Sequence, residues 1–222
     1  AVDFLKNSPL KDRFGSALEP IAMTGLSDIK LSNLTVPLTD TDATQVSGHV
    51  SFIESQLRHD LITDVGLLDV NGQLRFDNNG VYAENIKASL FNEIVDINVQ
   101  PKNDTTAIVM TGQVKTEQIN SVWPNSIPAF VQGKTAYTLD ITVLEKTIGD
   151  FYLDYSLSSE LKGIEIDIPA PFTKPKLDKK SLKVSLDNVD DNLVYFFKYG
   201  DDINVTAVNE DDNWRAAVKF GD

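Results

Sequence analysis

The sequence predicts an all-β protein: a curved, mainly antiparallel sheet that is open or partly open as a groove, with one or two short helices. Apolar residues recur at every second position through most of the 222 residues, which is the period of a strand with one buried and one solvated face. Segments rich in Asp, Asn, Gly and Pro separate these stretches as turns. No segment is long enough for a crossover helix, so neighbouring strands are expected to run antiparallel.

Two short helices are expected to interrupt the strand pattern. Ser8-Pro9 suits the start of a helix. An apolar stripe at four-residue spacing follows it over residues 9–18, formed by Leu10, Phe14 and Leu18. A second helical turn is predicted from Thr116, as its capping residue, to Trp123, and Pro124 ends it.

The alternating stretches define strands on both sides of a Pro-containing linker, Pro124–Pro128. In the first half the predicted strands are 29–31, 46–52, 70–76, 86–90, 95–99 and 108–114, with hairpin turns at 77–80 and 101–104. In the second half they are 137–143, 151–157, 164–168, 182–186, 193–199, 203–207 and 214–220, with a hairpin turn at 146–149. Residues 1–222 are therefore interpreted as one β-groove segment, in which 1–124 and 128–222 form quasi-repeats.

A strand that runs into a proline strap organises the second half. Ile164, Ile166 and Ile168 alternate with acidic residues, and Pro169-Ala-Pro171 then leaves the sheet because proline cannot donate to a strand ladder. Phe172 is expected to pack beneath this strap. Gly163, at the start of the strand, is typical of a bulge or a close backbone approach.

Charge excludes several classes of partner. Lys and Arg number 20 and Asp and Glu 33, which gives a net charge of −13. Nucleic acid and anionic lipid surfaces both require a basic patch, and the sequence has none. There is no cysteine, and no apolar run is as long as a membrane span. The chain is therefore expected to be a mature secreted protein or a piece of a longer one.

The sequence contains no catalytic motif. It lacks a nucleophile elbow, a phosphate-binding glycine loop and a zinc-binding histidine pair, and His49 and His59 fit ordinary surface positions. Acidic pairs such as Asp190-Asp191 fall at predicted turns, where Asp bonds nearby backbone. We expect no enzyme activity, catalytic residue, metal or cofactor, although paired carboxylates on an acidic β protein leave a glycan-active or glycan-binding domain as an alternative.

The apolar positions of the second half leave two interpretations open: the core of a closed sandwich, or a trough for a hydrophobic ligand. The candidate groove residues are Tyr137, Leu139, Ile141, Val143, Phe151, Leu153, Tyr155, Leu157, Ile164, Ile166, Ile168, Tyr195, Phe197, Val205, Val218 and Phe220.

The strap segment also resembles a pattern of the AsmA-like bacterial envelope family, in its YhdP branch. The matching residues are Ser159, Glu160, Leu161, Gly163, Ile164, Ile166, Ile168, Pro169, Pro171 and Lys174. Asn7–Leu10, Leu74–Phe76 with Gly80–Tyr82, and Lys219–Gly221 extend the resemblance over nearly the whole chain. The resemblance implies a segment of a long periplasmic chain, anchored in the inner membrane, whose apolar groove holds lipid acyl chains.

On this resemblance the expected function is to carry phospholipid between the inner and outer membranes, with acyl chains as the bound partner. The alternative is a structural or adhesive β-sandwich module of the cell envelope. An apolar face without a covering layer would favour the first, and a closed sandwich core the second.

Overall fold

The computed structural model describes residues 21–37, 45–59, 65–102, 105–147, 150–170, 172–189, 192–210 and 213–221. Within them, thirteen strands form a meander in which consecutive strands pair, except that β9 pairs with β7. The path runs from β1 to β13 without returning to β1, so the sheet formed by the described residues is open. The predicted fold class is confirmed.

The strands of the first half are β1 (Ile21–Thr35), β2 (Gln45–His59), β3 (Gly66–Asp77), β4 (Gly80–Leu90), β5 (Glu93–Lys102) and β6 (Thr105–Lys115). Helix α3 spans Thr116–Val122. Then follow β7 (Val131–Thr147), β8 (Asp150–Ser159), β9 (Ile164–Ile166), β10 (Leu182–Val189), β11 (Asn192–Tyr199), β12 (Ile203–Glu210) and β13 (Asn213–Phe220).

Local sequence sets the hairpin between β3 and β4. Asp77 pairs with Gly80, and the Asn79 N–H donates to Asp77 Oδ1 at 2.7 Å, as expected where Asp and Asn close a tight turn. The predicted helix at 9–18 lies outside the described residues, as do parts of the turns at 101–104 and 146–149.

Helix α3 is confirmed, but its predicted cap is wrong. The capping position is Lys115, whose N–H donates to Gln118 Oε1 at 2.8 Å. Thr116 is buried and faces β7 instead, where its Oγ1 accepts the Gly133 N–H at 3.2 Å. The tertiary contact with β7 therefore outweighs the local capping preference of threonine.

The chain divides into two units, and each is described separately. The first comprises Ala1–Val109 and Thr142–Tyr152. Its core lies on one face of β3, β4 and β5, where the register pairs Ala83 with Val99, Ile86 with Ile97 and Ala88 with Val95. All six residues are buried. Alternation with exposed Glu84, Lys87 and Asn98 explains why these strands have one apolar face.

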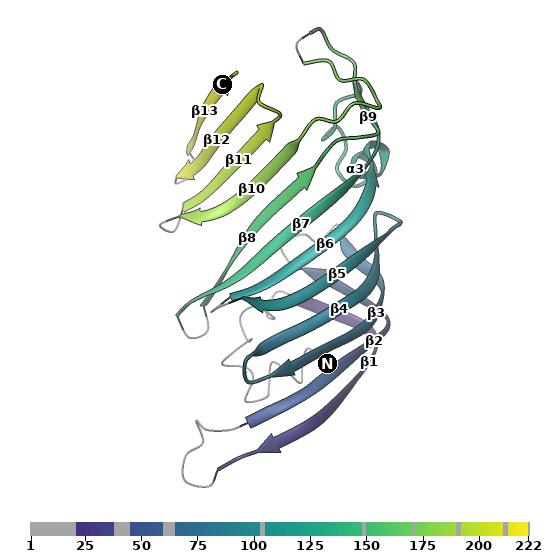
Figure 1. Cartoon of the computed structure of the whole chain (residues 1–222), viewed down its shortest axis with the longest axis vertical. Coiled ribbons are helices and arrows are strands. Elements are labelled where there is room, and N and C mark those ends of the chain that lie inside the picture. The colour runs from purple at the N-terminus through teal and green to yellow at the C-terminus, as the bar shows by residue number, and fades with distance from the viewer. Residues whose placement is uncertain are drawn as a thin grey trace. The chain divides into compact units, whose positions relative to one another are not determined.

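The second unit comprises Met110–Ile141 and Leu153–Asp222. In it, β8, β10, β11, β12 and β13 lie side by side in one layer (Figure 1). The segment between β8 and β10 carries the short strand β9, which pairs with the start of β7: Val131 with Ile166 and Gly133 with Ile164.

The strand predicted over 164–168 ends two residues early, at Ile166. The chain reverses there: Ile166 and Lys174 form an isolated antiparallel bridge, and the Asp167 N–H donates to Phe130 O at 2.9 Å. Ile168 therefore lies outside the strand. The cause is the strap itself, because Pro169 restricts the residue before it and has no N–H to continue a ladder.

Gly163 makes the close backbone approach that its position predicts. Its φ is +99°, and a Cβ there would lie 2.2 Å from Lys134 O. Gly133 of β7 faces it, and a Cβ there would lie 2.1 Å from Gly163 O. Only glycine fits both positions, so the pair fixes how the start of the strap meets β7.

The buried side chain of Lys174 stabilises the strap by hydrogen bonds to the backbone. It is 2% exposed, and its Nζ donates to Ile164 O at 2.7 Å and to Pro175 O at 3.1 Å. Burial lowers the pKa of Lys174, and Asp178 partly opposes this effect. The lysine at the end of the family-like pattern thus satisfies two backbone carbonyls next to β9.

Candidate functional site

The strand register of the second unit gathers apolar side chains on one face of β8 and β10–β13. The pairs Leu157–Val184, Val184–Phe197, Phe197–Val205 and Val205–Val218 form one cross-strand row. With the alternate positions on either side, this apolar face consists of Leu153, Tyr155, Leu157, Leu182, Val184, Leu186, Leu193, Tyr195, Phe197, Tyr199, Ile203, Val205, Ala207, Trp214, Ala216, Val218 and Phe220.

Much of the apolar face is solvent-exposed. Phe197 is 36% exposed, Val218 53% and Trp214 60%. Among the described residues all strands of this unit belong to one sheet, so the unit itself supplies no second sheet to cover this face. An exposed apolar surface of this kind is typical of a binding site rather than of a folded core.

The strap closes one end of the apolar face. Leu161 and Ile164 are buried together with Tyr199, and Ile166, Leu182 and Ile203 pack against them. The Tyr199 hydroxyl donates to Phe172 O at 3.4 Å, and the Phe172 ring lies 6.3 Å from that of Phe220. Burial raises the pKa of Tyr199. We call the row Leu182, Tyr199 and Ile203 the closed end.

The opposite face is mixed: it carries Phe196, Val194 and Val208 in its other rows, but the row next to the closed end is polar. In the row next to the closed end, Ser158 pairs with Lys183, Lys183 with Lys198, Lys198 with Asn204 and Asn204 with Lys219. Lys198 also lies 3.3 Å from Asp201. Charged and polar side chains therefore gather on this face, whereas the apolar face carries almost none.

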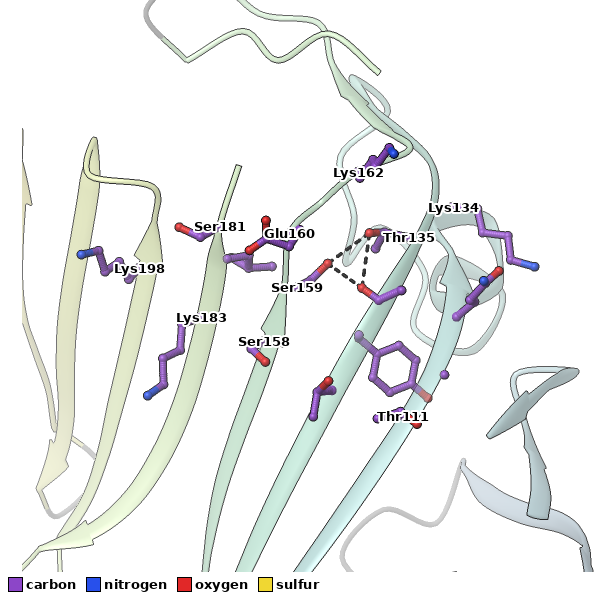
Figure 2. Close-up of a pocket in the computed structure, with 16 residues that line it drawn as sticks. Thr111, Lys134, Thr135, Ser158, Ser159, Glu160, Lys162, Ser181, Lys183 and Lys198 are labelled. Carbon is purple, nitrogen blue, oxygen red and sulfur yellow. Dashed lines mark hydrogen bonds between the residues drawn. The ribbon is translucent and has the colours of Figure 1, made fainter. Parts of the chain in front are cut away.

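An open hollow of about 870 Å³ lies at the ends of β6, β7, β8, β10 and β11 in the same unit. The lysines around it do not converge: Lys134 lies on the other side from Lys183 and Lys198 (Figure 2). Two hydroxyl groups of the hollow make contacts within the protein: Ser159 Oγ lies 3.1 Å from Thr135 Oγ1 and donates a hydrogen bond to Ala136 O at 2.7 Å. The lysines therefore do not form a common anion-binding site in this hollow.

Comparison with known proteins decides the family. The family described as "YhdP protein" matches residues 1–222. The chain belongs to the YhdP family. A curated relative, the "Intermembrane phospholipid transporter YhdP" of Escherichia coli (strain K12), is 23% identical over 189 residues, which are 83% of this chain and 14% of the relative. The chain thus spans about a seventh of that relative. No solved structure matches it.

The structure places half of the predicted groove residues of this YhdP-family chain on the apolar face: Leu153, Tyr155, Leu157, Tyr195, Phe197, Val205, Val218 and Phe220. Ile164 and Ile166 lie in the strap cluster at the closed end, and Ile168 follows β9. Their role in a groove, like that of the others, stays a prediction.

The β7 candidates share one side of their strand. The contact between Thr135 and Ser159 aligns Thr135, and with it Tyr137, Leu139 and Ile141, with the apolar face of β8. Tyr137 is buried, its hydroxyl has no hydrogen-bond partner among the described residues, and burial raises its pKa to about 12. Val143 is half-buried and belongs to the first unit; the side chain of Phe151 lies outside the described part.

Several residues of the apolar face were not among the predicted groove residues. Leu182, Val184 and Leu186 of β10 complete the face between β8 and β11, and Trp214 lies on it in β13. Their alternation was visible in the sequence; only the strand register shows that they share a face with the predicted residues.

In the part of the chain that the structure describes, no three His, Asp or Glu side chains are grouped to hold a metal ion. The helix found there is too short to cross a membrane.

Proposed function

We propose that this chain is a segment of a periplasmic bridge protein that carries phospholipid between the inner and outer membranes, with acyl chains held on the apolar face. The observation that carries the proposal is the exposure of Phe197, Trp214 and Val218 on a single sheet layer. A hydrocarbon chain removes such side chains from water at a gain of about 25 cal/mol for each Å² covered. Membership of the YhdP family, and a relative named as an intermembrane phospholipid transporter, support the same function.

The proposed role needs no catalytic residue. Lipid lies against the apolar face, and the hydrated face, with Lys183, Lys198 and Lys219, stays in water. In this proposal the parent chain is anchored in the inner membrane. A closed envelope sandwich, the alternative, is less well supported, because a sandwich requires a second sheet over this face.

Site-specific photo-crosslinking tests the proposal. A photo-reactive residue at Phe197 or Val218 is compared with one at Lys198 or Ala217, the adjacent positions on the opposite face. After incubation with phosphatidylcholine vesicles and irradiation, mass spectrometry should find lipid adducts at Phe197 and Val218 and none at the control positions. Equal labelling of both faces, or no adduct at either apolar position, would count against the proposal.

A further inference from the structure

One polar side chain on the apolar face has an unsatisfied hydrogen-bonding atom. Asn209 of β12 pairs with Leu193 on one side and Trp214 on the other, so it shares the apolar face. Its Oδ1 is buried and accepts no hydrogen bond from the described residues. A buried acceptor without a donor costs about 1–3 kcal/mol, so Asn209 calls for an explanation other than stability.

The neighbours of Asn209 are suited to a membrane-lipid headgroup. The ring of Trp214 lies 5.2 Å from that of Tyr195, at an angle of 49°, so the aromatic pair reaches across β12 beside the amide. Trp and Tyr combine apolar area with a polar tip, which suits them to the boundary between hydrocarbon and headgroup. Asn188 lies in the same cross-strand row, opposite Leu193. We call this row, Asn188, Leu193, Asn209 and Trp214, the polar end.

The polar end is far from the closed end. Tyr199 lies six positions after Leu193 in β11, a span of about 20 Å for an extended strand. The two rows between them are apolar apart from the tyrosine hydroxyls: Leu157, Val184, Phe197, Val205 and Val218, then Tyr155, Leu186, Tyr195, Ala207 and Ala216. The face is therefore polar at one end and apolar along the remainder, as a phospholipid is.

We propose that Asn209, with Trp214 and Tyr195 beside it, binds the headgroup of a phospholipid that carries an N–H or O–H donor, while the acyl chains lie toward the closed end. This inference rests on the proposed function. In this complex the partly buried Asn209 side chain turns its Oδ1 toward the open face, and the donor on the lipid completes the hydrogen bond that this atom lacks. Ethanolamine headgroups have such donors, whereas the quaternary ammonium of choline has none, so the site distinguishes lipids of equal charge and equal chains.

The experiment is a competition read by native mass spectrometry. The 222-residue chain is incubated with vesicles containing equal amounts of phosphatidylethanolamine, its N,N-dimethyl derivative and phosphatidylcholine, all with the same acyl chains. Both lipids with an N–H should be bound at least about fivefold more than phosphatidylcholine, the ratio that one hydrogen bond provides. The headgroup of the dimethyl lipid is close to that of phosphatidylcholine in size. Tighter binding of the dimethyl lipid than of phosphatidylcholine would therefore show hydrogen bonding rather than steric fit.

Asn209→Leu and Asn204→Leu form the matched pair of variants, because both lie in β12 and face opposite sides. Asn209→Leu should keep total lipid binding, lose the preference and melt at the same or a higher temperature, since it removes an unsatisfied acceptor. Asn204→Leu should keep the preference. Three results would each overturn this inference and leave the proposed function standing. They are lipid binding without a preference in the parent chain, a preference that survives Asn209→Leu, and a lower melting temperature for that variant. Absence of all lipid would overturn the proposed function as well.

Discussion

The Tyr137 hydroxyl has a measurable effect on stability that can be predicted in sign. It is buried and has no partner in the part of the chain that the structure describes, so Tyr137→Phe should raise the free energy of unfolding near pH 8 by about 1 kcal/mol. The pKa in the folded protein, about 12, lies above the usual tyrosine pKa of 10.0. Ionisation of Tyr137 therefore leaves the free energy of unfolding unchanged below pH 10. As pH rises from 10 toward 12, the free energy of unfolding falls by about 1.4 kcal/mol for each pH unit. Urea unfolding at pH 8 and pH 11 should show a larger loss for the parent chain than for Tyr137→Phe.

Tyr199→Phe is the control for this prediction. Its hydroxyl donates to Phe172 O, so its removal should lower stability at pH 8, the opposite sign. If Tyr137→Phe also lowers stability there, its hydroxyl has a partner in solution and the argument from an unsatisfied group is wrong.

Gly163 gives a second prediction for a single residue. A Cβ at this position would lie 2.2 Å from Lys134 O, and the φ of +99° is unfavourable for other residues. Gly163→Ala should therefore lower the free energy of unfolding by more than about 2 kcal/mol. Lys162→Ala, at the exposed neighbouring position, should change it by less than about 0.5 kcal/mol. Equal denaturant midpoints for the two variants would contradict the close backbone approach.

At the scale of the strand pair, β10 and β11 place two like charges opposite each other. Lys183 pairs directly with Lys198 on the face opposite the apolar face, an arrangement that destabilises a sheet. Lys183→Glu should raise stability by about 0.2–1 kcal/mol, and the gain should shrink at high salt because both groups are exposed. Lys176→Glu makes the same charge change at an exposed position of the strap and should bring no comparable gain. Thermal unfolding at two salt concentrations measures both effects.

How much of each element the sequence predicts depends on whether a local period specifies it. The strands, the Asp77–Gly80 turn and the position of α3 follow from spacing and turn chemistry, and the structure confirms them apart from the early end of β9 at Ile166. The closed end does not follow, because it depends on the strap crossing to β7 and on Lys174 reaching back to Ile164. The Thr116 cap was wrong for the same reason, since a contact with Gly133 decides its orientation.

The candidate site illustrates the same limit. Alternation identifies Phe197, Val205 and Val218 as residues of one face, but not the residues that β10 adds between them and β8. Asn209 was overlooked because a polar residue at an apolar position interrupts the pattern on which the prediction relies. Its unpaired Oδ1 becomes visible only when all neighbours are placed.

On the scale of the whole molecule, a net charge of −13 is combined with an uncovered apolar face. High net charge favours solubility, which permits apolar side chains to remain exposed without a second layer. The open face also determines how the protein responds to a new charge. In a sealed core, an unpaired carboxylate is excluded from water at a cost of several kcal/mol, whereas on an open layer it stays hydrated.

Val218→Asp tests this property of the molecule. Val218 is 53% exposed on the apolar face, so the substitution should cost about 1 kcal/mol or less, mainly from lost strand propensity and packing. It should nevertheless reduce the phospholipid bound in native mass spectra, because an acyl chain covering the new carboxylate would remove it from water. Ala217→Asp, the adjacent position on the opposite face, should have a similar cost in stability and leave lipid binding unchanged. If Val218→Asp unfolds the chain while Ala217→Asp does not, the face is sealed in solution and the envelope sandwich becomes the better description.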